Sequence, residues 1–226
     1  MEETKKETEQ TRGEDCAKEL DAQYEKLKAL GCPDQVLDIL REQRDEVLKK
    51  AGGMTVGEGN IPFLPIIPYT CLSPYSLMSM VRIGDKAGRN YLKSTDIKNV
   101  VEVPENPYYI FDIDTGRGTL GKKREEVFSI CSEQGRRCLT ADEVMNLCIH
   151  SNALSSHNVL AGGSSYSLNG IPNVTFMRGD CAALGWVPAD FSGGKWAFAT
   201  CAVTGDEDAG ALAGGGEGCS SCGGMF

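Results

Sequence analysis

Residues 106–114 read NPYYIFDID, and this stretch decides the fold that the sequence predicts. Its run of aromatic and β-branched residues is typical of a β-strand. Sequence patterns typical of helices follow this strand along the chain. Residues 122–135, KKREEVFSICSEQG, predict a helix that ends at Gly135. The central part of the chain therefore combines a strand with helices that have to pack against it.

A second helix is predicted over residues 139–152, LTADEVMNLCIHSN. It opens with a capping box, in which Thr140 caps the helix and the side chain of Glu143 reaches back to the cap. Residues 73–84, SPYSLMSMVRIG, predict a further helix with Pro74 in its first turn.

Other segments predict strands around these helices. The prolines in residues 61–70, IPFLPIIPYT, exclude a central strand and favour an edge strand or extended segment. Residues 173–178, NVTFMR, and residues 195–201, KWAFATC, predict later strands. Strands and helices are mixed without regular βαβ repetition, so we expect an α+β fold.

The chain is expected to have five parts. Apolar residues recur at helical spacing after residue 15, and Gly31 separates two amphipathic helices. We expect these helices to cover a face of the main domain or to bind a partner. The parts are a disordered arm (1–14), an N-terminal helical hairpin (15–50), a glycine-rich linker (51–60), a mixed α+β main domain (61–203) and a disordered, flexible Gly/Cys C-terminal tail (204–226).

Charge and hydropathy exclude several classes of function. The net charge of -9 argues against a nucleic-acid partner and against binding to anionic lipid. No apolar run approaches the roughly 20 residues of a membrane helix, so no membrane insertion is expected. The N-terminal residues, MEETKKETEQTRGED, lack the apolar core of a signal peptide. We therefore expect a cytoplasmic, bacterial protein.

The chain has 10 cysteines, and a reducing compartment disfavours structural disulfides. Four of them lie in apolar surroundings and are expected in the core as small, inert side chains. These four are Cys71, Cys131, Cys148 and Cys201.

Asp112 and Asp114 end the predicted strand and are the weak candidates for catalytic residues. Asp112-x-Asp114 resembles the nucleophile motif of haloacid dehalogenase phosphatases, and Asp114-Thr115-Gly116 resembles the triplet of aspartic proteases. The residues that follow depart from the first pattern, and a second triplet is absent. The favoured interpretation is a strand that ends in a turn, with Asp114 and Thr115 bonding their own backbone and Gly116 at positive φ. An enzyme of unknown reaction stays open as an alternative.

The two histidines, His150 and His157, are candidate metal ligands together with Cys148. Their spacing matches no standard zinc pattern. Cys181 is isolated in the sequence. A cysteine–histidine nucleophile pair stays open, and ordinary structural roles are expected for all of these residues.

Residues 61–201 resemble an uncharacterised bacterial family of unknown function. The matching stretches are LPIIPYT, GRNYL, FDIDTG, LTADE, LGW and WAFATC. The resemblance implies a shared fold and assigns no catalytic residue. We expect members to stop near the position of Cys201, which would make the tail an extension with its own function.

The tail resembles the leader–core junction of ribosomally synthesised and post-translationally modified peptide (RiPP) precursors with nitrile-hydratase-like leaders. Such leaders end in an acidic stretch, an aliphatic residue, a small residue and glycines. The corresponding cleavage junction here is Leu212, Ala213, Gly214, Gly215 and Gly216, and the residues available for modification are Cys219, Ser220, Ser221 and Cys222. The resemblance implies that the folded body is a large leader. The implied partners are a peptide-modifying enzyme and a Gly-Gly peptidase or transporter that exports the C-terminal product, with no cofactor.

The alternative keeps the tail attached. Cys219 and Cys222 form a C-x-x-C pair, which is a two-electron redox couple or half of a metal site for Zn or Fe. In this interpretation the protein is a cytosolic thiol-redox or metal-binding protein, and its tail carries electrons or metal to a partner.

Overall fold

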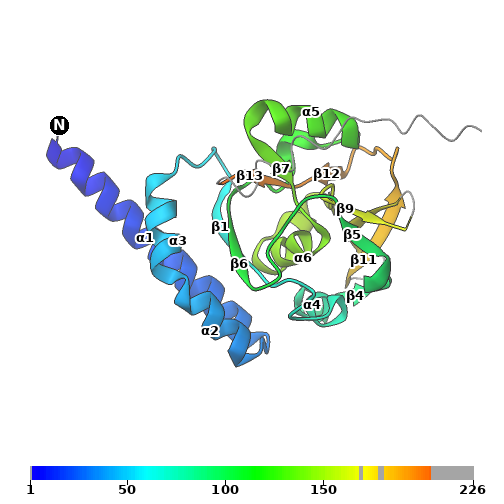
Figure 1. Ribbon diagram of the computed structural model, residues 1–226, viewed down its shortest axis with the longest axis horizontal. Helices are drawn as coiled ribbons and strands as arrows, with labels where there is room; N and C mark the ends of the chain where they lie inside the picture. The colour runs from blue at the N-terminus through cyan, green and yellow to red at the C-terminus, as the bar shows by residue number, and fades with distance from the viewer. Residues whose placement is uncertain (1, 168–169, 178–180, 205–226) are drawn as a thin grey trace, which may run out of the picture.

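The computed structural model describes residues 2–167, 170–177 and 181–204. An elongated layer of three helices, α1–α3, lies beside a body in which strands and shorter helices surround helix α6 (Figure 1). The expected α+β class is confirmed. The described helices are α1 (Glu2–Ala29), α2 (Asp34–Glu42), α3 (Arg44–Gly53), α4 (Pro74–Met80), α5 (Arg124–Gln134) and α6 (Ala141–His150), with 3-10 turns η1 (Ser94–Asp96), η2 (Arg117–Thr119) and η3 (Ala153–Ser155).

The largest described sheet has seven strands and mixed direction. Its order is β12-β8-β10-β11-β4, with β9 joining β10 to β5; the β12–β8 and β11–β4 pairs are parallel. Three two-stranded sheets, β1–β6, β13–β7 and β2–β3, complete the body. The strands are β1 (Ile61–Ile66), β2 (Arg82–Ile83), β3 (Lys86–Ala87), β4 (Arg89–Asn90), β5 (Ile97–Asn99), β6 (Tyr108–Ile113), β7 (Arg136–Cys138), β8 (Asn158–Leu160), β9 (Ser164–Tyr166), β10 (Gly170–Met177), β11 (Cys181–Pro188), β12 (Trp196–Phe198) and β13 (Thr200–Ala202).

The NPYYIFDID segment forms β6 and pairs antiparallel with β1, with Phe63 opposite Phe111. Within the described residues β6 is the ladder partner of β1. This agrees with the expectation from the prolines, because a proline nitrogen cannot donate to a strand on the second edge. An isolated bridge between Asp114 and Thr200 then ties the end of β6 to β13.

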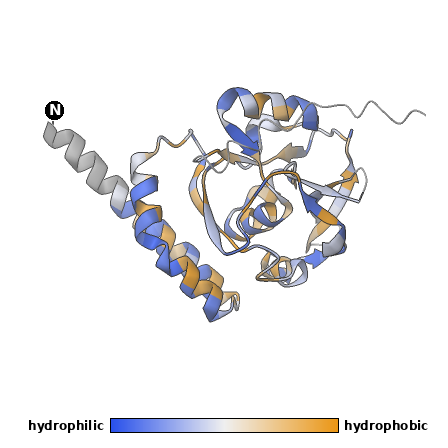
Figure 2. Ribbon diagram, in the orientation of Figure 1, coloured by the Kyte–Doolittle hydropathy of each residue, from blue (hydrophilic) through white to orange (hydrophobic). Residues whose placement is uncertain are grey.

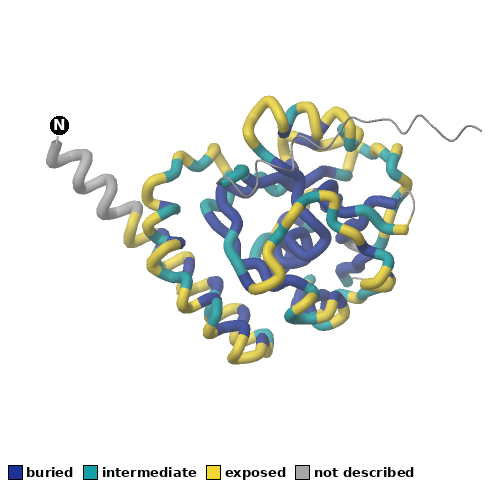
Figure 3. Tube along the Cα trace, viewed as in Figure 1, coloured by how far each residue is buried: buried dark blue, intermediate teal, exposed yellow. Residues whose placement is uncertain are grey.

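Helix α6 lies at the centre of the body (Figure 3), and residues 141–149 are all buried. The predicted capping box is present: the Thr140 N–H donates to Glu143 Oε2 at 2.7 Å, and the Glu143 N–H donates to Thr140 Oγ1 at 3.4 Å. A helix buried on every side has to satisfy its polar groups internally. The buried carboxylates of α6 therefore need hydrogen-bond or ion-pair partners inside the fold.

The N-terminal helices differ in extent from the sequence prediction. Helix α1 begins at Glu2, inside the residues expected as an arm, and α3 continues to Gly53, inside the expected linker. Three helices occupy the region where two were expected. Helices α2 and α3 carry both hydrophobic and hydrophilic residues (Figure 2). Apolar residues of α1 and α3 pack onto the body: Leu20 and Val47 join one cluster with Phe63 and Phe111.

Candidate functional site

Asp112 sits at the end of β6 with a φ of 50°, a left-handed conformation that is uncommon for a residue other than glycine. The Gly57 N–H donates to its Oδ1 at 2.8 Å, and Asn60 Nδ2 donates to the same atom at 2.7 Å. Arg136 forms an ion pair with Oδ2 and donates to the Asp112 carbonyl at 2.6 Å. Burial alone raises the pKa of Asp112, but these bonds outweigh it and lower the pKa. The carboxylate therefore anchors residues 57–60 and β7.

Asp114 closes a turn. Its Oδ1 accepts hydrogen bonds from the backbone N–H groups of Gly116 at 2.8 Å and Arg117 at 3.0 Å, and Gly116 has a φ of 112°. This is the turn that the sequence favoured. Among the described residues, neither aspartate lines either of the two cavities described below.

A buried ion pair links β7 to the first turn of α6. Arg137 donates to Glu143 through two nitrogens, at 2.8 and 2.7 Å, and the Tyr108 hydroxyl donates to Glu143 Oε1 at 2.8 Å. Burial raises the pKa of Glu143, whereas the Arg137 charge and these bonds lower it, and the balance is a lowered pKa. Sequence reasoning assigned Glu143 to the helix cap alone and gave no role to Arg137.

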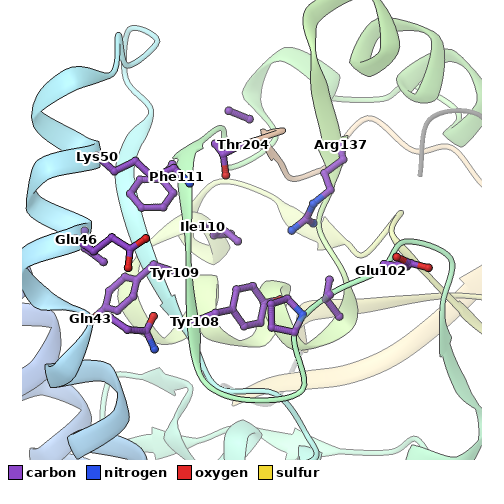
Figure 4. A pocket seen from close by; sticks show the side chains of 14 residues that line it. Gln43, Glu46, Lys50, Glu102, Tyr108, Tyr109, Ile110, Phe111, Arg137 and Thr204 are labelled. Atoms are coloured by element: carbon purple, nitrogen blue, oxygen red, sulfur yellow. The ribbon is translucent and has the colours of Figure 1, made fainter. Parts of the chain in front are cut away.

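The larger cavity, here called the α3–β6 cavity, has a volume of about 610 Å³. Helix α3 forms one wall and β6 the floor, and residues 102–104, Arg137, Ala202 and Thr204 line the rest. Glu46 and Lys50 lie on one side, and Arg137 and Glu102 lie on the other (Figure 4). Lys50 Nζ lies 4.6 Å from the centre of the Phe111 ring. Thr204, the last described residue, also lines this cavity.

The second cavity, here called the α1–α6 cavity, has a volume of about 460 Å³. Side chains of α1 and the end of α6 line it, together with residues of the loops before β1 and after β6. Gln23, at 4% exposure, and His150 belong to its wall. Sequence reasoning missed this cavity, because it joins four segments that are far apart in the chain.

The two histidines have different environments. His157 Nε2 lies 2.7 Å from the Thr115 carbonyl and Nδ1 lies 2.8 Å from Ser156 Oγ. Burial and, secondarily, the charge of Lys26 lower the pKa of His150 to about 3. Within the described residues no group of three or more His, Cys, Asp or Glu side chains is placed to hold a metal ion.

The predicted core cysteines are buried at positions 131, 148 and 201, whereas Cys71 is half-buried, as is Cys181. No disulfide joins cysteines in the described part of the chain. Burial raises the pKa of the Cys148 thiol. The predicted junction, residues 212–216, and the predicted Cys219–Cys222 segment lie outside the described residues.

No described helix combines the length and apolar character needed to cross a membrane. No curated protein and no solved structure matches the chain. The model of a family of unknown function, DUF5701, matches residues 22–170, which is about two thirds of the sequence. The match begins earlier than the expected residue 61, so it includes α2, α3 and the end of α1, and it stops at the first residue of β10. The chain therefore belongs to the DUF5701 family of unknown function.

Proposed function

We propose that this protein is the precursor of a ribosomally synthesised, post-translationally modified peptide. In this proposal the folded body is the leader that holds the modifying enzyme, and residues 217–226 are the core peptide. The observation that carries the proposal is the position of Thr204 on the wall of the α3–β6 cavity. The C-terminal segment starts beside an open cavity, where an enzyme bound to the body has the segment within reach.

The bonding of the acidic side chains in the body supports the assignment of the body as leader and the tail as the reactive segment. The carboxylates of Asp112 and Glu143 are committed to ion pairs with Arg136 and Arg137. A carboxylate fixed by an arginine and several further bonds is a poor base and a poor nucleophile. The reactive residue types of the tail, Cys219 to Cys222, lie beyond the family match, which ends at residue 170.

The α3–β6 cavity is the feature of the body that the modifying enzyme recognises in this proposal. It offers two walls of mixed charge around an aromatic floor, and Lys50 and Glu102 stand on different walls. A partner segment that enters such a cavity gains both apolar contact and charge pairing, which fixes its direction. Bound there, the enzyme acts on a segment that begins at residue 205.

The first test is the intact mass of the protein and of its tail peptide from the native host. We expect cleavage after Gly215 or Gly216. The mass of the tail also identifies its chemistry: heterocycle formation loses one water for each ring, serine dehydration loses one water before a thiol adds, and a sulfur-to-carbon crosslink loses two hydrogens. An unaltered full-length chain contradicts the proposal. Two free tail thiols, or Zn or Fe bound by them, would then support the thiol-redox or metal-binding alternative.

A pair of matched variants tests the role of the body. Lys50→Glu reverses a charge on the cavity wall, and Lys49→Glu makes the same change at an exposed neighbour outside it. We expect Lys50→Glu to reduce tail modification in the host and Lys49→Glu to leave it unchanged. Equal modification of both variants would show that the cavity does not hold the enzyme.

The junction is tested in the same way. A peptidase cleft that accepts extended glycine backbone excludes side chains by steric clash. Gly216→Val is therefore expected to block cleavage, whereas Ala209→Val, upstream of the junction, is expected to leave it intact. Cleavage of both variants would contradict the assigned junction.

A further inference from the structure

The α3–β6 cavity runs along one edge of β6. Four consecutive residues of this strand, 108–111, line it. Successive side chains of a strand point to opposite faces: Phe111 packs with Val47 of α3, whereas the Tyr108 hydroxyl donates to Glu143 of α6. Because the cavity is lined from both faces of β6, it lies at the edge of the strand, where the backbone borders it.

The register with β1 shows which backbone groups of β6 point to this edge. Pro65 lies opposite Tyr109 and has no N–H, so these two residues form a pair that is not hydrogen-bonded. Bonded and non-bonded pairs alternate in an antiparallel ladder, so Tyr109 and Phe111 direct their N–H and C=O groups away from β1, and Ile110 directs its groups toward β1. Within the described residues β1 is the ladder partner of β6, and no other backbone hydrogen bond reaches Tyr109 or Phe111. The edge of β6 at the cavity is therefore open to a further strand.

The chain itself approaches this edge from β13. The Asp114 N–H donates to the Thr200 carbonyl at 2.9 Å, and the Thr200 N–H donates to the Asp114 carbonyl at 3.0 Å, in an antiparallel bridge just beyond β6. After this bridge the chain runs back along β6. Ala202 and Thr204 both line the cavity, and Thr204 is the last described residue. The residues that follow Thr204 thus start beside the open edge, in the direction of an added antiparallel strand.

The charges of the cavity are compatible with the residues that follow. The sequence continues as Gly-Asp-Glu-Asp over residues 205–208. Lys50 and Arg137 stand on opposite walls (Figure 4), and successive side chains of an added strand point alternately to the two walls. Glu46 and Glu102 also line the cavity, at exposed positions, and oppose part of this attraction. Backbone pairing with β6 therefore has to supply most of the binding free energy.

We propose that residues 205–208 extend β13 as an antiparallel strand along the open edge of β6 and occupy the α3–β6 cavity. Their backbone N–H and C=O groups pair with those of Tyr109 and Phe111. The covalent link through Thr204 keeps the segment at a high effective concentration beside the edge, and the added strand protects that edge from other chains. This docking does not depend on the proposed function. Where that function holds, the modifying enzyme competes with residues 205–208 for the same edge.

Amide hydrogen exchange, measured by NMR on the full chain and on a chain that ends at Thr204, tests the docking. We expect the amide protons of Tyr109 and Phe111 to exchange about tenfold or more faster in the shortened chain. Ile110 is the internal control, because its N–H points to β1 and its exchange rate is expected to stay the same. Equal exchange in the two chains overturns the proposal. Faster exchange of Ile110 to the same degree also overturns it, because the tail would then stabilise the whole body rather than this edge.

Proline variants of the full chain identify the docked segment. Consecutive residues of a strand direct their N–H groups to opposite edges, so the double variant Asp206→Pro, Glu207→Pro removes a donor to β6 in either register. The matched control, Gly210→Pro with Ala211→Pro, places two prolines beyond the segment. We expect the first variant to exchange like the shortened chain and the control like the full chain.

Equal exchange in the two double variants contradicts the assignment of residues 205–208. Protection of Tyr109 and Phe111 that increases with protein concentration would show that a second copy occupies the edge, and would overturn docking within one chain. None of these measurements depends on modification or cleavage of the tail. Their outcome is therefore separate from that of the mass measurement that tests the proposed function.

Discussion

Arg137 and Glu143 face each other across the start of α6 as a buried pair joined by two hydrogen bonds. The arginine side chain is 7% exposed and the glutamate side chain is fully buried. Glu143 stands in the first turn of the helix, where the helix dipole also favours a negative charge. The pair therefore fastens β7 to the central helix, with Tyr108 of β6 as a third partner.

Replacement of this carboxylate is expected to be severe. Glu143→Gln leaves the buried Arg137 charge without its counter-charge, which costs about 3–5 kcal/mol of the free energy of unfolding. Glu126→Gln is the matched control, because Glu126 occupies the same capping position of α5 but is exposed. Its expected cost is about 1 kcal/mol or less. Urea unfolding of both variants separates the two contributions, and equal costs would mean that the pair adds nothing beyond the cap.

The two aspartates of the DID sequence are expected to respond differently to removal of charge. Asn tolerates the left-handed backbone at position 112, but Asp112→Asn breaks the ion pair with Arg136, at an expected cost of about 2–3 kcal/mol. In Asp114→Asn the amide oxygen still accepts from the backbone of Gly116 and Arg117, so a change below about 1 kcal/mol is expected. Chemical denaturation measures both. A large loss for Asp114→Asn would argue for a role beyond the turn.

Much of the local structure was accessible from the sequence, because the signals are local. The strand at 108–113, the capping box of α6 and the turn at Asp114 each depend on residues within a few positions of one another. The sheet order was not accessible, since strands such as β8 and β9 have three residues, too short for a periodic pattern. The extent of α1 was missed because a charged stretch with Gly13 has no apolar face to signal a helix.

The candidate sites depended on contacts between distant segments. The sequence does not show whether Arg136 or Arg137 pairs with Glu143, because the two arginines are consecutive and both lie a few residues before the start of α6. Sequence reasoning did not single out Gln23, which is buried where its side chain donates to the Phe63 carbonyl of β1. His150 was expected to have an ordinary structural role, and its position on a cavity wall follows from the tertiary fold.

Asp142 is expected to make stability decrease as the pH rises. Burial, together with the nearby Glu143 charge, raises the pKa of Asp142 from 3.8 to about 7, although a bond from the Tyr69 N–H lowers it. Between these two values the folded state keeps a proton that the unfolded chain has lost. The contribution is therefore fully present below pH 3.8 and is lost as the pH rises through about 7.

Asp142→Asn removes this dependence. We expect the variant to be more stable than the unchanged protein by about 1–3 kcal/mol at about pH 8, and to lose that advantage at about pH 5. His150 acts in the opposite direction: burial lowers its pKa from 6.5 to about 3, so the unfolded state binds more protons in that range and stability falls as the pH drops. Because both proteins contain His150, the difference between them isolates Asp142. Parallel pH profiles of unfolding free energy would contradict the assignment.

The cysteines of the body are expected to divide into two classes of reactivity toward a thiol-alkylating reagent. Reaction needs both access and thiolate. Burial and the charge of Asp34 raise the pKa of Cys32 to about 11, and burial raises the pKa of Cys148. Cys71 and Cys181 are half-buried and therefore accessible. In the native chain at about pH 8 we expect Cys71 and Cys181 to react well before Cys32 and Cys148.

Peptide mass spectrometry after timed quenching measures these rates, and labelling of the urea-unfolded chain is the control in which all body cysteines react alike. Cys148 lies on the central helix, so its labelling reports the opening of the body itself. If Cys148 reacted as fast as Cys181 in the native chain, α6 would have to be exposed far more often than its packing implies. If Cys148 stays protected, the body opens only rarely, as expected for a stable folded body whose proposed reactive segment lies in the separate tail.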